Sequence, residues 1–217
     1  VSVSTTSGFS IVKWTGSGAN ATIGHGLGKV PTMIIVKNLS SYNWNVYSVG
    51  LGATKNLVLN EAEDTETQSY WQDTTPTSDV FYVNSNGNVN QSSTQMIAYC
   101  FHDVTGFSKC GSTFVGNGNS NGTFVYTGMK ISWLMIKNTS DNGDNWTIYD
   151  NTRDTDNPAE KLLFSNNNSS ESTGNNIDLL SNGFKIRSTS NGANGSGDTF
   201  VYLAFGQSLV GSNNTPC

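Results

Sequence analysis

The chain has 217 residues, enough for one large all-β domain or for two domains of ordinary size with real cores. Aromatic residues make up 11% of it, which excludes a disordered chain, because such chains lack the large apolar side chains that offset the entropy of ordering. The net charge is −5 and the eleven lysines and arginines are scattered singly, so no basic stripe is available for nucleic acid. No apolar run approaches the roughly 20 residues that span a bilayer, so we expect no membrane insertion.

Strand signals follow one another along the chain, and we find no convincing amphipathic helix. Residues 33–36 and 96–101 are continuously apolar, which predicts central strands covered on both faces. Phe184 and Ile186 alternate with polar neighbours, the period-2 pattern of a half-buried strand. Clusters of Asn, Gly and Ser, such as "NSNGN", separate the strands and predict loops.

The second half repeats the first, block by block and in the same order, at a distance of roughly a hundred residues. In both copies an apolar strand ends in Lys-Asn, at Lys37-Asn38 and at Lys137-Asn138. The matched blocks are "GFSIVKWTGSG" (8–18) with "GFSKCGSTFVGNG" (106–118), "NWNVY" (43–47) with "NWTIY" (145–149), "NLVLN" (56–60) with "KLLFS" (161–165), "VFYV" (80–83) with "GFKI" (183–186), and "TQMIAYCF" (94–101) with "DTFVYLAF" (198–205).

These blocks predict an all-β fold of two tandem, internally duplicated antiparallel β-sandwich domains of the jelly-roll-like kind. We expect repeat 1 at residues 1–104, repeat 2 at 105–207 and a C-terminal tail at 208–217. The joint near "HDVTG" is only about five residues long, too short for a flexible linker. The two domains should therefore dock rather than swing.

Trp44 and Trp146 occupy matching places ahead of alternating strands, so we expect both to be packed in a core. Three cysteines cannot all pair, and none forms a C-x-x-C motif. Free thiols are the favoured interpretation, and the alternative is a disulfide between Cys110 and Cys217. His25 lies in the glycine-rich segment "GHGLG", where we expect a structural role.

The succession "GHGLGKVPTMIIVKN", "NWNVY", "YWQDTTPTSDVF" and "MIAYCF", followed by "NWTIYDNTRDTDNP" and "GDTFVYLAF", resembles a repeated domain of unknown function. That domain occurs in structural proteins of marine bacteriophages, including cyanophages, and the likeness runs from about Gly8 to Gln207. The resemblance implies a component of the virion, assembled in the host cytoplasm, such as a tail fibre or a protein of the particle surface. It brings no assigned catalytic or binding residues.

"YWQDTTPTSDVF" is the most distinctive single stretch. Tyr70 and Trp71, next to Gln72 and Asp73, could form an aromatic platform with polar neighbours that contacts a glycan or a protein. The alternative is that Trp71 fills the core and Asp73 caps the turn, because large aromatic side chains are usually packed.

Two further stretches gather oxygen atoms of the kind that calcium prefers. Asp141 and Asp144 lie in "SDNGDN", and a second group follows in "DNTRDTD" (150–156). Asp and Asn also form turns by bonding to their own backbone, without any metal. Apart from this candidate calcium site, we expect no cofactor.

The leading hypothesis is a non-enzymatic virion structural protein, a tail-fibre or surface-fibre module for assembly or host attachment. We expect a homo-oligomer, with a trimer on a tail fibre, whose partners are other virion proteins and host cell-surface glycan. One alternative is a capsid-decorating or filament-forming protein. Another is a carbohydrate-processing depolymerase, which would need a carboxylate pair on facing strands.

Overall fold

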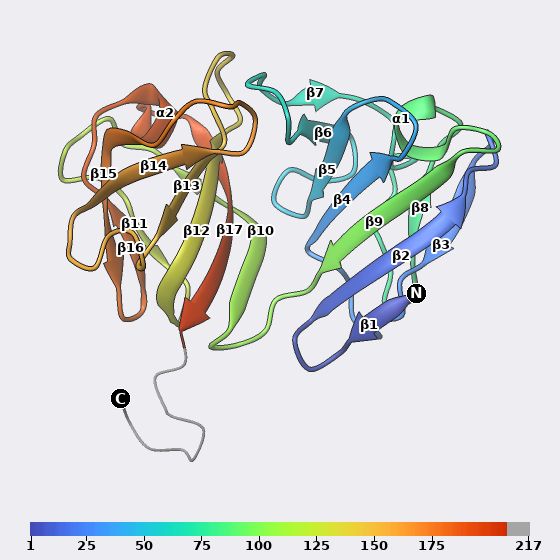
Figure 1. The fold of residues 1–217 in the computed structure, drawn as a ribbon, viewed down its shortest axis with the longest axis horizontal. Coiled ribbons are helices and arrows are strands. Elements are labelled where there is room, and N and C mark those ends of the chain that lie inside the picture. Colours follow the sequence, from blue (N-terminus) through green and yellow to red (C-terminus); the bar gives the residue numbers. More distant parts are fainter. Residues whose placement is uncertain (208–217) are drawn as a thin grey trace.

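Residues 1–207, which the computed structural model describes, form antiparallel β-strands in two bodies that lie side by side (Figure 1). Two single turns of helix accompany them, α1 (Gly87–Asn90) and α2 (Asn191–Asn194). Neither turn, nor any other helix in this described part, is long and apolar enough to cross a membrane. The predicted all-β antiparallel fold is confirmed, and the tail at 208–217, with Cys217, lies outside the described residues.

The first sheet has seven strands in the order β1-β2-β9-β4-β5-β6-β7. A separate antiparallel pair, β3 with β8, packs its apolar side chains against one face of this sheet. The strands are β1 (Ser2–Ser4), β2 (Phe9–Thr15), β3 (Ala21–Gly24), β4 (Met33–Asn38), β5 (Trp44–Ser48), β6 (Lys55–Val58), β7 (Glu66–Thr67), β8 (Val80–Val83) and β9 (Gln95–Phe101).

The second sheet has eight strands in the order β10-β17-β12-β13-β14-β15-β16-β11. It curls until its two ends almost meet, since the Thr123 hydroxyl, next to β11, donates to the Val115 carbonyl of β10 at 2.7 Å. The strands are β10 (Ser108–Val115), β11 (Phe124–Tyr126), β12 (Lys130–Asn138), β13 (Thr147–Asp150), β14 (Ala159–Phe164), β15 (Ser172–Leu180), β16 (Gly183–Ile186) and β17 (Thr199–Gln207).

One run of five strands occurs in both sheets in the same order. β2-β9-β4-β5-β6 in the first sheet has the same connectivity as β10-β17-β12-β13-β14 in the second. The strands that hold Met33 to Val36 and Leu134 to Ile136 therefore occupy the same central position. The strand registers also correct one matched block. Val46 lies opposite Leu57, and its counterpart Ile148 lies opposite Leu163. Leu57 therefore matches Leu163 rather than Leu162.

Apolar side chains form three layers, one inside each body and a third between them. The first body's core holds Ile34 and Val36 of β4, while Met33 and Ile35 of the same strand face the shared layer. Alternation of this kind means that both faces of β4 are covered, as its continuous apolar run predicted. The shared layer contains Met33, Ile35, Val46, Leu57, Cys110, Met135, Trp146, Val201 and Leu203.

Polar contacts at the rim of the shared layer hold the two bodies together. The Gly111 carbonyl of β10 accepts a hydrogen bond from the Ser48 hydroxyl at 2.6 Å and from the Gly50 amide at 2.9 Å. Gly111 has a φ of +72°, and a Cβ there would lie 2.2 Å from the Thr32 carbonyl oxygen. Only glycine allows the two backbones to approach this closely. The bodies are docked, as the short joint predicted.

Both central strands end in an asparagine that ties the strand to the helical turn of its own body. The Asn38 amide donates to the Gly87 carbonyl of α1 at 2.8 Å. In the second body, the Asn138 amide donates to the Asn191 carbonyl of α2 at 3.0 Å. Both asparagines are fully buried, so each needs these partners to offset the loss of water. The repeated Lys-Asn pair thus marks a repeated structural anchor.

The matched tryptophans are not equally buried. Trp146 is 1% exposed, and its indole N–H crosses the shared layer to the Val58 carbonyl at 2.8 Å. Trp44 is only half-buried and lines a surface hollow of about 270 Å³ with Leu59 and Ser165. The expectation that both are packed in a core is therefore met in full by Trp146 and only in part by Trp44, which packs against the shared layer at its rim.

We predict that Trp146→Ala lowers the free energy of unfolding by about 3–5 kcal/mol, because the change opens a cavity and breaks the bond to Val58. Trp44→Ala should cost less than half as much, since its ring already meets solvent. Urea denaturation of both variants measures the difference. Equal losses would contradict the assignment of Trp146 to the layer that joins the bodies.

Lys137 is a buried lysine at the junction of the two bodies. Its ammonium donates to the Asn138 carbonyl at 2.7 Å and to the Ala62 carbonyl of the first body at 3.3 Å. Burial lowers the pKa of Lys137 to about 8, against the opposing effect of Asp144 and Asp64. The equivalent Lys37 is more exposed, and burial lowers its pKa as well.

We predict that Lys137 makes the chain gain stability as the pH rises from about 8 to about 10.5. The unfolded chain keeps the lysine proton in this range while the folded chain releases it, so the free energy of unfolding rises by up to about 3 kcal/mol. Chemical denaturation of the parent and of Lys137→Met across this range isolates the contribution. Lys37→Met is the matched control and should change the slope less. A Lys137→Met variant with the parent's slope would contradict the assignment.

Candidate functional site

The stretch around Trp71 does not form a surface platform. Trp71 is 1% exposed and packs edge-to-face on Tyr47, with ring centroids 5.8 Å apart. Its indole N–H donates to the Lys55 carbonyl at 3.1 Å. The ring therefore fills the core of the first body, as the alternative interpretation of this stretch proposed.

The neighbours of Trp71 are also used inside the fold. Tyr70 is 8% exposed, and the Gln72 amide donates to the Val83 carbonyl at 2.7 Å and to the Ala21 carbonyl at 3.1 Å, which fixes the segment on β8 and β3. Asp73 alone of the four predicted contact residues is exposed. Because Tyr70 and Trp71 are both buried, this segment is part of the core, and the prediction of a binding platform is wrong.

Asp144, one of the two predicted calcium ligands, accepts a hydrogen bond from the Asn138 amide at 2.9 Å. The same amide donates to Asp198 at 3.0 Å. Burial raises the pKa of Asp144, and Asp141 and Asp198 add to the rise, while the bond from Asn138 and the charge of Lys137 oppose it. Among residues 1–207, no three His, Cys, Asp or Glu side chains gather as a metal site would require. Calcium binding by Asp141 and Asp144 stays a prediction.

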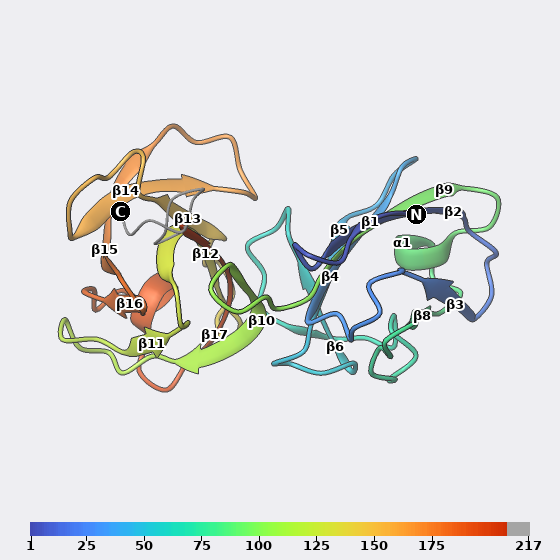
Figure 2. The ribbon, with the colours of Figure 1, turned by 90° about the horizontal axis from the view of Figure 1, so that it is seen from below.

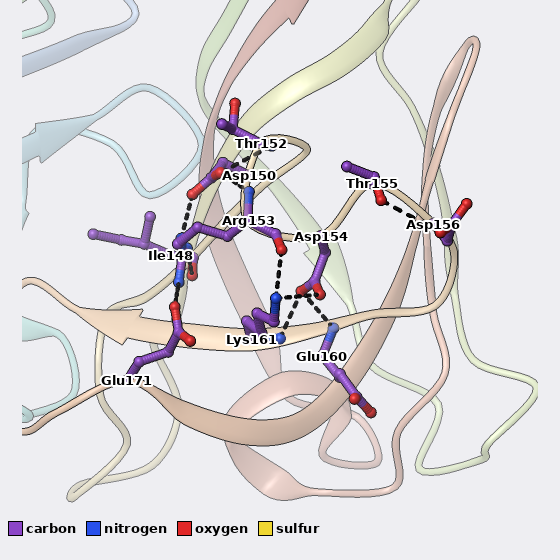
Figure 3. A network of polar contacts seen from close by, with 10 residues as sticks. All are labelled: Ile148, Asp150, Thr152, Arg153, Asp154, Thr155, Asp156, Glu160, Lys161 and Glu171. Atoms are coloured by element: carbon purple, nitrogen blue, oxygen red, sulfur yellow. Dashed lines mark hydrogen bonds and ion pairs between the residues drawn. The ribbon is translucent and has the colours of Figure 1, made fainter.

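The second acidic stretch forms an ion-pair network (Figure 3). Arg153 bonds to Asp150 at 2.5 Å and to Glu171 at 3.2 Å. Asp154 accepts the backbone amides of Glu160 and Lys161 at 2.9 and 2.7 Å. Burial alone would raise the pKa of Asp150, but hydrogen bonds and the charge of Arg153 lower it overall. These oxygen atoms already have partners.

Sequence reasoning missed a group of four phenylalanines at the seam between the bodies. Phe9 and Phe101 lie 4.9 Å apart, Phe101 and Phe205 lie 6.2 Å apart, and Phe107 lies 6.1 Å from Phe205 between ring centroids. The group consists of two matched pairs. Phe9 and Phe107 belong to the two "GFS" blocks, Phe101 is the last residue of β9, and Phe205 lies two residues before the end of β17. The repeated "GFS" block carried the signal, but nothing in the sequence showed that its two copies meet.

The four rings line an open groove, which we name the seam groove. It consists of two adjoining hollows of about 380 and 290 Å³ that share Ser7 and Phe107. The chain crosses from β9 to β10 at this end of the molecule, where β1 also lies (Figures 1 and 2). Phe107 is 42% exposed, although its ring is among the largest apolar groups of the chain. The lining is Ser4, Thr6, Ser7, Val104 and Phe107 in one hollow, and Ser7, Phe9, Phe101, Phe107 and Phe205 in the other.

An apolar groove with aromatic walls suits contact with an apolar group of a partner. It carries no charged side chain in its lining, so it has no means of binding an ionic ligand strongly. The seam groove is the candidate functional site.

A family model described as a domain of unknown function, DUF7483, matches residues 1–208. The chain belongs to this family. Neither a curated protein nor a solved structure matches it. The DUF7483 match runs across both bodies, so the seam groove lies within the span of the domain rather than between two family members.

His25 of the DUF7483 domain is fully buried and has a structural environment. Its Nδ1 accepts the Leu27 amide at 3.2 Å, which leaves Nε2 as the donor to the Thr77 carbonyl, also at 3.2 Å. Burial lowers the pKa of His25 below its ordinary value of 6.5, although Thr77 and Asp79 favour the charged form. The neutral ring is the one that fits.

We predict that His25 makes the domain lose stability as the pH falls below about 6.5. The unfolded chain takes up a proton there before the folded chain does, so the free energy of unfolding drops by at most about 1.4 kcal/mol per pH unit. Denaturation between pH 7 and 5 should show a shallower slope for His25→Gln than for the parent. His102→Gln is the control for the other histidine and should keep the pH dependence of the parent. If His25→Gln has the same pH dependence of unfolding free energy as the parent, the assignment to His25 is contradicted.

Proposed function

We propose that the chain is a non-enzymatic structural protein of a bacteriophage particle, a module of a tail fibre or surface fibre that serves assembly or host attachment. The observation that carries the proposal is the shared apolar layer, which packs the two sheets against each other. A fibre transmits position from the particle to its target, and it needs modules that do not bend internally. The resemblance to marine phage structural proteins supports the same function.

We further propose that residues 1–104 and 105–207 are two copies of one jelly-roll-like sandwich unit, joined by duplication. Three kinds of correspondence support this: the common order of five strands, the buried asparagines Asn38 and Asn138, and the paired phenylalanines of the seam groove. A further pair agrees, because Asn60 and Asn166 accept the backbone amides of Trp44 and Trp146 at 2.8 and 3.0 Å.

The proposed working form is a homo-oligomer, a trimer on a tail fibre, which contacts other virion proteins or host glycan through many weak sites. Charged residues are only 12% of the chain, so long-range attraction to any partner is small. Presenting several copies raises avidity by about 10² to 10⁴ without new contacts.

We predict that antibodies against the chain label purified phage particles, and that the purified oligomer adsorbs to host surface polysaccharide without releasing reducing ends. Immunogold microscopy and a reducing-sugar assay measure the two outcomes, and sedimentation measures the oligomeric state. Release of sugar fragments would favour the depolymerase alternative. Labelling spread over the capsid shell would favour the decorating protein, and a tightly binding monomer would contradict the multivalent form.

A further inference from the structure

The outer edge of β1 is an unpaired sheet edge. Within residues 1–207, β1 is the end strand of its sheet and pairs with β2 alone, through Ser2 with Ile11 and Ser4 with Phe9. All three residues of β1 are exposed, and the Val3 side chain is 44% exposed. An end strand presents backbone N–H and C=O groups that can pair with another strand.

The end strand of the second body, β10, already uses part of its outer edge within the protein. β10 is the end strand of its sheet, but its Gly111 carbonyl accepts bonds from Ser48 and Gly50 of the first body. At its far end, the Val115 carbonyl accepts the Thr123 hydroxyl as the sheet curls round. The two bodies therefore differ at this edge, and the difference leaves β1 open.

The open edge and the seam groove adjoin. Ser4 is the last residue of β1 and also lines the larger hollow, opposite Val104 and Phe107. The strand edge and the apolar hollow thus share the residue Ser4. In strand addition, main-chain hydrogen bonds give affinity and pockets for alternate side chains give selectivity.

We propose that the seam groove and the β1 edge together bind an extended, uncharged segment of another protein. The segment adds as a strand beside β1, and one bulky apolar side chain of the segment fills the groove against Phe107. The hollow of about 380 Å³ lies at the small end of ordinary binding pockets, which run from about 300 to 1,000 Å³. That volume suits one or two side chains rather than a folded surface.

A polypeptide fits this surface better than the other candidate occupants do. A sugar would need polar partners around its hydroxyls, whereas the groove offers the hydroxyls of Ser4, Thr6 and Ser7 on one side only. A second copy pairing through its own β1 would contribute the three residues of that strand, against the roughly 20–30 residues a side of a stable interface. This peptide-binding proposal goes beyond the proposed function, and it does not depend on the particle or cell in which the chain works.

The test uses a capped seven-residue peptide, Thr-Val-Thr-Phe-Thr-Val-Thr, titrated into the isotopically labelled full chain. We expect saturable binding, shifts of the Ser2, Val3 and Ser4 amide signals, and slower hydrogen exchange at the outward-facing amides of β1. Replacing the central Phe of the peptide by Ser should weaken binding by at least about tenfold, a loss of about 1.4 kcal/mol.

Two N-methylated peptides test whether a strand is added. An extended segment points alternate N–H groups to opposite sides, so methylation of odd positions and methylation of even positions block different edges. Strand addition requires that one of the two peptides loses binding by at least about tenfold while the other keeps it. Equal binding of the two would overturn the proposal.

Two matched variants test the groove. Phe107→Ser removes its exposed wall, and Phe124→Ser is the control, because Phe124 is 43% exposed against 42% for Phe107 and does not line the groove. Phe107→Ser should weaken peptide binding at least about tenfold, and Phe124→Ser should leave it unchanged. Equal effects of the two variants, or no saturable binding by the parent, would overturn the proposal.

The other occupants give separate results. If the parent forms dimers that Phe107→Ser abolishes, the groove belongs to a second copy. If a chain ending at Gln207 binds the peptide at least about tenfold more tightly than the full chain, the groove belongs to residues 208–217. Either result overturns the proposal that the groove binds a strand of another protein. Neither result changes the outcome of immunogold labelling, which tests the proposed function separately.

Discussion

The shared apolar layer is the interaction on which the rest of the structure depends. Each sheet is apolar on both faces: one face covers the core of its own body, and the other holds residues such as Ile35 or Met135 that face the opposite body. Either body alone would expose this second face to water, and an exposed apolar surface of that size is unfavourable at roughly 25 cal/mol for each Å². The two halves are therefore one folding unit in energetic terms, even though their strand orders correspond. Trp146, which bonds across the layer to Val58, is the largest fully buried side chain in it.

The layer also explains why an aromatic groove exists where it does. Corresponding strands turn corresponding faces toward each other, so matched residues from the two halves meet near the ends of β9 and β17. There the layer is no longer closed by neighbouring strands, and Phe101 and Phe205 meet each other with solvent beside them. Close approach is possible because Gly111 carries no side chain against Thr32. The groove is thus the open end of the joint that holds the halves together.

Apolar periodicity predicted much of the fold and little of the site. The runs at 33–36 and 96–101 identified central strands because a strand covered on both faces need not alternate. Burial of Trp71 could only be weighed against exposure, since one tryptophan beside polar residues fits either place. The difference between Trp44 and Trp146 depends on which indole reaches across the layer, a contact between residues 88 positions apart for Trp146 and Val58. Likewise, the meeting of Phe101 with Phe205 follows from the docking of two bodies, which no local pattern encodes.

The two described cysteines, Cys100 and Cys110, are free thiols buried in different layers of the protein. Burial raises the pKa of Cys100 to about 12, despite a hydrogen bond involving Ser10, and burial together with Asp103 raises that of Cys110. The thiolate is the form that reacts with oxidants and disulfides, so both buried thiols are unreactive at neutral pH. Transfer from a reducing compartment to an oxidising one would leave these two sulfur atoms unchanged. Neither of these two thiols therefore ties the described fold to one redox environment.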